Sequence, residues 1–275
     1  MAVEEQKRHW RSKLANKHVI LGYDDLEPMS GMLLLLAAIK SLLRLFPTLV
    51  DKVVVVLVAM PLVDTENKPL HLPYRQSVQK QVEALNDMYP ALVLLYERRM
   101  AFVERVSLFA SADILVNAAV RHGLNLVPLE FVLCGGDKQP GFVVSEFLGV
   151  SRVMPGAVRT NPWRDECTAK AIHKLLMQEP HEKKFWQQLQ VEFCCNNTVV
   201  SWADKAYLDM KRIRELMLSQ SGGLASLLDV RSRCRLGIAK VPYKEMSTNY
   251  LQPDKVYAAY QSTSTRLIMV DHRQA

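Results

Sequence analysis

The sequence predicts an α/β fold, a doubly wound, Rossmann-like parallel sheet followed by C-terminal helices. Two observations support this prediction. Apolar, β-branched runs such as Lys52 to Met60 alternate with segments of helical periodicity, which is the pattern of consecutive βαβ units. These runs are apolar at nearly every position rather than at every second one, as expected for parallel strands that helices cover on both faces.

The elements follow in order along the chain. The expected strands are His18 to Gly22, Lys52 to Met60, Ala91 to Tyr96, Asp113 to Asn117 and Gly141 to Ser145. Four helices are expected between these strands. The first ends near Phe46, the second contains Val78, Val82 and Leu85, the third covers Met100 to Ala110, and the fourth ends near Leu133. Further helices are expected at 169–177, 181–193 and 198–218, the last with an apolar stripe of Val199, Trp202, Ala206, Met210, Ile213 and Met217.

Ligands of doubly wound sheets bind at the carboxyl ends of the strands. The turns after Gly22, Asn117 and Ser145 are therefore the expected site.

The composition restricts the function classes. The net charge of +7 is spread along helices without a platform of aromatic and basic side chains, so nucleic acid is not an expected partner. The longest apolar run, Met32 to Ile39, is far shorter than the roughly 20 residues of a membrane span, and a cytoplasmic protein without a membrane partner is expected. His71, His173 and His181 lack ligand spacing, so neither a metal nor another cofactor is expected.

Three strings resemble the synthase family of trehalose metabolism, in the family's order and spacing. They are GYDDLEPMSG at 22–31, similar to GVDRLDYxKG; RHGLNLVPLE at 121–130, similar to RDGMNLxxxE; and VSEFLG at 144–149 with NPW at 161–163, similar to SEFxG and NPW. Members of this family, glycosyltransferase family 20, have two Rossmann-like lobes in a GT-B fold. The resemblance implies that this chain is the C-terminal, donor-binding lobe.

The end of the chain adds a fourth similarity. Residues 233–235, 251–260 and 266–271 resemble the junction at which class II, plant-type members enter a phosphatase-like domain. The resemblance implies a lobe with C-terminal helices at 1–218, a linker at 219–250 and the truncated start of a phosphatase-like domain at 251–275. Phosphatase activity is not expected, because Arg273 stands where the second Asp of a DxDGT motif would follow Asp271.

The resemblance also implies a site for UDP-glucose. The segment that approaches the sugar, the phosphates and the ribose matches Gly123, Leu124, Asn125, Leu126, Val127 and Glu130. Within it, Glu130 matches the acid that accepts hydrogen bonds from ribose hydroxyls.

Three positions depart from the family's pattern. Asp25 and Ser30 stand where active members have the Arg and Lys that hold the diphosphate, and His122 replaces an Asp that binds glucose hydroxyls. The local charge changes from about +2 to −1, which weakens diphosphate binding and stabilisation of the leaving group. No catalytic residue is therefore expected from this chain.

Local structure is the alternative explanation of each position. The 22–31 loop can be a plain strand-to-helix turn, Glu130 a solvated or paired acid, and His122 a turn residue. Two functions follow. One is a trehalose-6-phosphate synthase-like protein whose family reaction transfers glucose from UDP-glucose to glucose 6-phosphate, here impaired and binding UDP or UDP-glucose weakly. The other is a non-catalytic regulatory or interaction subunit, with a full-length synthase as its partner.

Overall fold

The computed structural model describes residues 2–14, 17–62, 71–123 and 125–219. Six parallel strands form one sheet in the order β3-β2-β1-β4-β5-β6. The strands are β1 (His18–Asp25), β2 (Val53–Met60), β3 (Val93–Tyr96), β4 (Ile114–Asn117), β5 (Gly141–Ser145) and β6 (Val158–Thr160). The predicted doubly wound α/β fold is confirmed.

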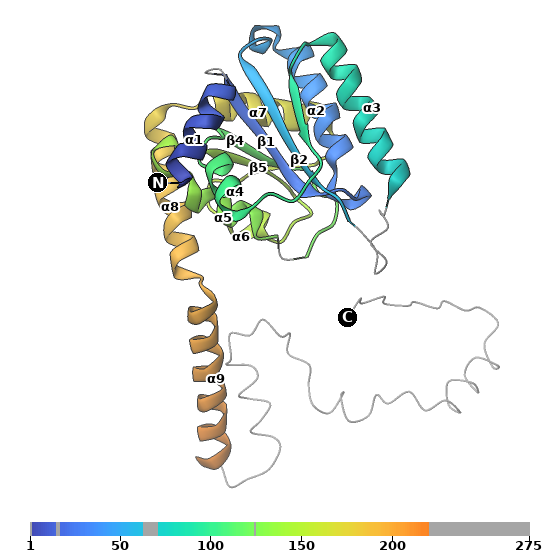
Figure 1. Cartoon of the computed structure of the whole chain (residues 1–275). Helices are drawn as coiled ribbons and strands as arrows, with labels where there is room; N and C mark the ends of the chain where they lie inside the picture. The colour runs from blue at the N-terminus through green and yellow to red at the C-terminus, as the bar shows by residue number, and fades with distance from the viewer. Residues whose placement is uncertain (1, 15–16, 63–70, 124, 220–275) are drawn as a thin grey trace, which may run out of the picture. The chain divides into compact units, whose positions relative to one another are not determined.

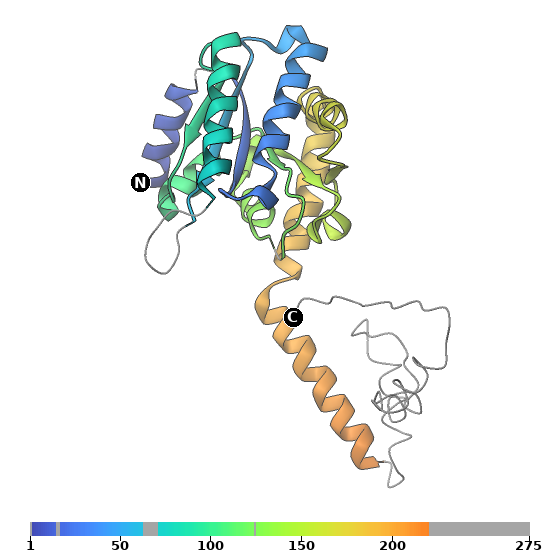
Figure 2. The same cartoon turned by 90° about the vertical axis from the view of Figure 1, so that its right-hand side faces the viewer.

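Helices cover both faces of the sheet (Figures 1 and 2). One face packs against α2 (Met32–Leu45), α3 (Leu72–Met88) and α7 (Asp165–Leu176). The other packs against α1 (Ala2–Lys13), α4 (Phe102–Phe109), α5 (Val127–Cys134) and α6 (Val150–Val153), with α8 (Pro180–Asn196) beside α5. Three 3₁₀ turns are η1 (Pro28–Ser30), η2 (Pro47–Leu49) and η3 (Gly136–Lys138).

The apolar character of β2 and α2 is explained by burial. Every residue of β2 from Val53 to Ala59 is buried, because helices lie on both sides of this strand. The segment Pro28–Leu45, which contains α2, is long and apolar enough to cross a membrane by length and composition. In the structure, Leu36, Ile39 and Leu42 of this helix are fully buried in the core of the sheet.

The sequence prediction missed elements that lack an apolar run. β6 has only three residues and exposes Arg159, because it pairs with β5 alone at the edge of the sheet. Half of the residues of α1 are charged, and the helix buries the indole of Trp10. The first strand also continues three residues beyond the predicted end at Gly22, so Asp24 and Asp25 belong to β1 rather than to the following turn.

The chain divides into two units, Met1–Thr198 and Val199–Ala275. The described part of the second unit is the helix α9 (Val199–Ser219). The predicted linker at 219–250 and the predicted phosphatase-like start at 251–275 lie, apart from Ser219, outside the described residues.

Candidate functional site

The first candidate site lies between the carboxyl ends of β1 and β4. The strand order reverses here, and such a switch point is where doubly wound sheets bind ligands. The loops that follow the two strands are held together, because the Val120 amide donates to the Met29 carbonyl at 2.8 Å. Gly31 permits this approach: its φ is +70°, and a Cβ there would lie 2.0 Å from the Ala118 carbonyl oxygen.

Asp24 is the buried acid of this crevice. Its carboxylate accepts hydrogen bonds from the Asp25 amide at 2.9 Å and from the Asn117 side-chain amide at 3.3 Å. The His122 Nε2 lies 3.7 Å from the same carboxylate. Burial raises the pKa of Asp24 to about 6, and the Asp25 amide and His122 oppose this shift. His122 is therefore placed against an acid of its own chain.

The two positions that the sequence resemblance aligns with the basic clamp lie in different surroundings. Asp25 ends β1 and is half-buried, whereas Ser30 is only 3% exposed. The Ser30 hydroxyl donates to the Glu27 carbonyl at 2.7 Å, within η1. Ser30 thus stabilises its own turn and lines the small cavity beside Asp24 and Asn117. The enclosed space beside Asp24 and Asn117 is about 10 Å³, which is room for about one water molecule.

Gly123 and residues 125–130 belong to the stretch between the carboxyl end of β4 and the first turn of α5. The Asn125 side-chain carbonyl accepts the Val127 amide at 2.9 Å and so begins α5, while its side-chain NH₂ is buried without a partner among the described residues. A Cβ on Gly123 would meet no described atom within 4 Å, and Leu126 is exposed. Leu124 lies outside the described residues. The buried amide of Asn125 is a donor that a ligand oxygen at this position would satisfy.

Glu130 lies on the first turn of α5 and is paired within the chain. Its carboxylate is 3.2 Å from the Arg105 guanidinium, and the two side chains are 39% and 28% exposed. Arg105, from α4, also interacts with the hydroxyl of Tyr23, whose pKa is raised by burial. The sequence prediction missed Arg105, because nothing in the local pattern of α4 distinguishes it from a solvated helix residue.

The SEF and NPW strings flank a second pocket at the same edge. It follows β5 and β6, has a volume of about 550 Å³, and its polar lining includes Glu146, Arg159, Asn161 and Arg164. The Asn161 side chain accepts the Trp163 amide at 3.0 Å and leaves that indole exposed. Among the described residues, no group of three or more His, Cys, Asp or Glu side chains is placed to hold a metal ion.

The strand order and the position of the crevice define a doubly wound, Rossmann-like α/β protein, a class whose ligands bind at the switch point. Residues 1–212 match the model of glycosyltransferase family 20, and the chain belongs to this family.

Curated relatives and solved structures agree with this assignment. The chain is 28% identical to alpha,alpha-trehalose-phosphate synthase [UDP-forming] 5 of Arabidopsis thaliana, over 95% of this chain and 31% of that protein. The N-terminal domain of Candida albicans trehalose-6-phosphate phosphatase superposes with a TM-score of 0.70 at 27% identity, over 77% of this chain and 45% of the other. An E. coli trehalose-6-phosphate structure with bound UDP-2-fluoro glucose superposes with a TM-score of 0.69 at 18% identity, over 76% of this chain and 49% of the other. This similarity shows the shared fold. The chain thus spans about a third of the length of that plant relative.

Proposed function

We propose that this chain forms the donor-side part of a trehalose-phosphate synthase-like protein, binding UDP or UDP-glucose weakly and contributing no catalytic residue. The family assignment supports the ligand class, since one solved neighbour binds a UDP-sugar. The observation that carries the proposal is the acidic crevice: Asp24 and Asp25 stand at the end of β1, where a diphosphate needs cations.

One buried side-chain donor supports retained binding. Asn125 keeps a buried NH₂ without a described partner. The start of α5 adds little to it, because the Val127 amide already donates to Asn125 and the next residue, Pro128, has no N–H. A ligand held by the Asn125 amide alone lacks the charge compensation that a leaving diphosphate requires. Weak binding with impaired transfer is therefore the function that this geometry supports.

Calorimetry with UDP and UDP-glucose on the full chain tests the proposal. We expect saturable but weak binding, and Asp25→Arg should tighten it by roughly tenfold, which corresponds to about 1.4 kcal/mol. Asp87→Arg is the matched control, because it makes the same charge change at an exposed position near the end of α3. The absence of saturable binding in both the original chain and Asp25→Arg would refute a donor site here.

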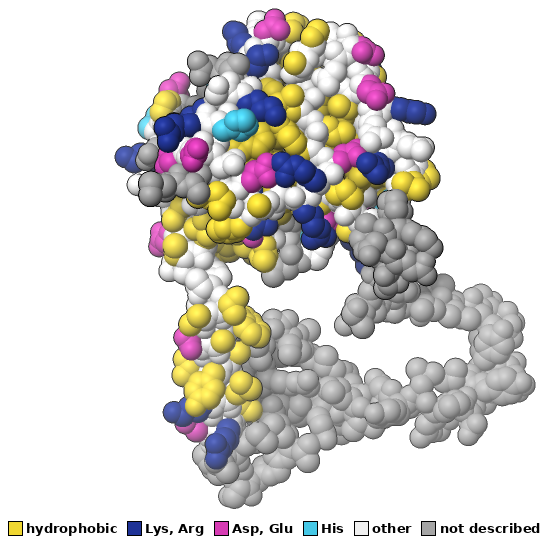
Figure 3. Space-filling view, in the orientation of Figure 1, with side chains coloured by type: hydrophobic (Ala, Val, Ile, Leu, Met, Phe, Trp, Pro, Cys, Tyr) yellow, Lys and Arg dark blue, Asp and Glu magenta, His cyan; other side chains and the backbone are white. Residues whose placement is uncertain are grey.

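A second function, as a regulatory or interaction subunit, is supported by α9. Figure 3 shows apolar side chains along this helix. Val199, Trp202 and Met210 of the predicted stripe are more than half exposed. Exposed aromatic and apolar side chains of this kind are typical of interaction surfaces.

Sedimentation of the chain with a full-length active synthase tests this second function. We expect a complex that the double variant Trp202→Ser and Met210→Ser loses. Leu133→Ser on α5, another exposed apolar position, should leave the complex intact. If the proteins do not associate at micromolar concentration, this function is excluded for that partner.

A further inference from the structure

A separate pocket lies at the amino-terminal edge of the sheet, opposite the crevice at Asp24. It has a volume of about 350 Å³. Its lining comes from the end of α1, the start of β1, the turn before β4 and η3, and consists of Arg11, Leu14, Lys17, His18, Val19, Ser111, Asp113 and Lys138. Because β1 is eight residues long, its two ends are roughly 23 Å apart, so the pocket and the crevice are distinct sites.

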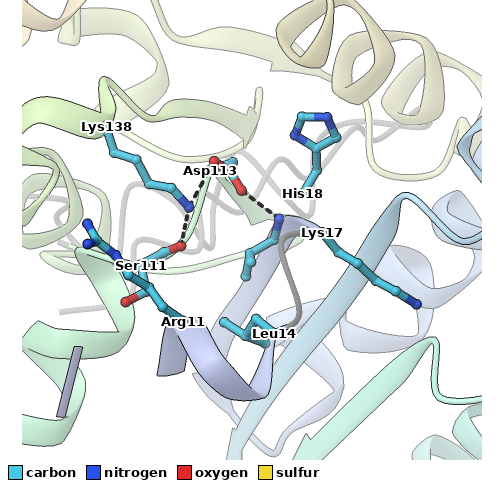
Figure 4. Close-up of a pocket in the computed structure, with 8 residues that line it drawn as sticks. Arg11, Leu14, Lys17, His18, Ser111, Asp113 and Lys138 are labelled. Atoms are coloured by element: carbon cyan, nitrogen blue, oxygen red, sulfur yellow. Dashed lines mark hydrogen bonds and ion pairs between the residues drawn. The ribbon is translucent and has the colours of Figure 1, made fainter. Parts of the chain in front are cut away.

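The floor of the pocket is an internally satisfied ion pair. The Asp113 carboxylate accepts the Val19 amide at 2.7 Å, and the Lys138 ammonium lies 2.9 Å from its other oxygen. Lys138 also donates to the Ser111 carbonyl (Figure 4). This lining carboxylate is thereby neutralised, and the floor is fixed by contacts that need no ligand.

The remaining basic groups of the pocket have no such compensation. Neither Arg11 nor Lys17 forms an ion pair with a carboxylate of the described residues, and His18 adds an imidazole. Figure 4 shows Arg11 on the same side as Lys138, with His18 opposite and the Lys17 ammonium turned outward. The position of Arg11 in the last turn of α1 suits the helix dipole, but the dipole explains neither Lys17 nor the cavity.

We propose that this amino-edge pocket binds a small phosphate monoester, of the size of a sugar phosphate. The volume lies within the range of small-molecule sites and is too small for a macromolecule. The Arg11 guanidinium and the Lys138 ammonium lie on the same side of the pocket and suit the oxygens of a phosphate dianion, while Lys17 adds positive charge at the rim. Leu14 and Val19 offer an apolar wall for the rest of the ligand. A ligand here binds independently of the donor crevice, which makes the pocket an effector site.

Calorimetry of the full chain with glucose 6-phosphate, inorganic phosphate and glucose tests the proposal. We expect saturable binding of glucose 6-phosphate that weakens with added salt, and no binding of glucose. Arg11→Gln should reduce the affinity by about tenfold and Lys17→Gln by less, because the ammonium of Lys17 points outward. The double variant should reduce the affinity by more than either single variant. UDP should not compete with the phosphate compounds.

The control is the double variant Lys80→Gln and Lys170→Gln, which removes two exposed charges from α3 and α7 and should keep the original affinity. Thermal unfolding of both double variants should match the original chain, because the replaced groups have no described ion-pair partner. If inorganic phosphate binds as tightly as glucose 6-phosphate, the site belongs to the free ion. If inorganic phosphate binds more weakly than glucose 6-phosphate, the site belongs to the sugar phosphate. Unchanged affinity in the Arg11 and Lys17 double variant, or no saturation by either phosphate compound, would overturn the proposal.

Discussion

Asp24 and His122 join the end of β1 to the turn after β4, with 3.7 Å between the Asp24 Oδ1 and the His122 Nε2. Asp24 is 8% exposed and holds hydrogen bonds from Asn117 and the Asp25 amide as well. Because burial raises the pKa of Asp24 to about 6, the crevice contains an acid whose charge is costly in the folded state. His122 is the basic side chain placed against it.

Asp24→Asn should therefore change how stability depends on pH. Folded Asp24 keeps its proton up to about pH 6, while its ordinary pKa is 3.8. Between these values the folded state binds more protons than the unfolded state, so the contribution of Asp24 to stability falls as pH rises. In urea unfolding, the stability of Asp24→Asn relative to the original chain should rise by roughly 2 kcal/mol from about pH 4.5 to about pH 7.

Asp87→Asn on the exposed face of α3 is the control for this measurement, and its stability relative to the original chain should stay level over the same range. If the stability of Asp24→Asn relative to the original chain also stays constant between these pH values, Asp24 is hydrated in the folded state.

Ser30→Lys should destabilise the protein rather than restore a diphosphate clamp. Ser30 is 3% exposed and its hydroxyl donates to the Glu27 carbonyl, so a lysine there buries an ammonium or breaks η1. We expect a loss of about 2 to 4 kcal/mol in the free energy of unfolding. Asp25→Arg, at a half-buried strand end, should change it by less than about 1 kcal/mol. Equal stability of the two variants would show that position 30 opens to solvent.

Gly31→Ala tests whether the two loops of the crevice depend on close backbone contact. An alanine Cβ would overlap the Ala118 carbonyl and would also require a left-handed conformation. We expect a loss of at least about 3 kcal/mol by chemical denaturation. Gly149→Ala is the matched control, since Gly149 has a φ of −57° and a Cβ there meets no described atom within 4 Å. Comparable losses in both variants would argue against this role of Gly31.

The helices and strands that the sequence predicted correctly are those whose buried side chains form a continuous or periodic apolar pattern along the chain. The valine-rich run of β2 and the periodic positions of α3 could be assigned directly, whereas the three-residue edge strand β6 carries an exposed arginine and no pattern. The candidate site likewise has features that the sequence predicted and features that it did not. The crevice at the ends of β1 and β4 was expected from topology, but the burial of Ser30 depends on contacts between elements distant in sequence.

Glu130 illustrates this limit and gives the last prediction. The sequence resemblance implies that it binds ribose, while the structure pairs it with Arg105 at 3.2 Å. Both roles are compatible, because a carboxylate that is 39% exposed keeps acceptor sites free. Glu130→Gln should cost less than about 1 kcal/mol of stability, since the ion pair is partly solvated.

The substitution Glu130→Gln should instead change the binding of UDP. The original chain should bind UDP more tightly than 2′-deoxy-UDP, because the ribose hydroxyl donates to Glu130, and Glu130→Gln should reduce this preference by roughly tenfold because a neutral amide accepts less strongly. Glu83→Gln, exposed on α3, should keep the preference and serves as the control. Calorimetry with both nucleotides measures the ratio. If the ratio in Glu130→Gln equals that of the original chain, Glu130 acts only as the partner of Arg105, and the ribose lies elsewhere along the carboxyl edge of the sheet.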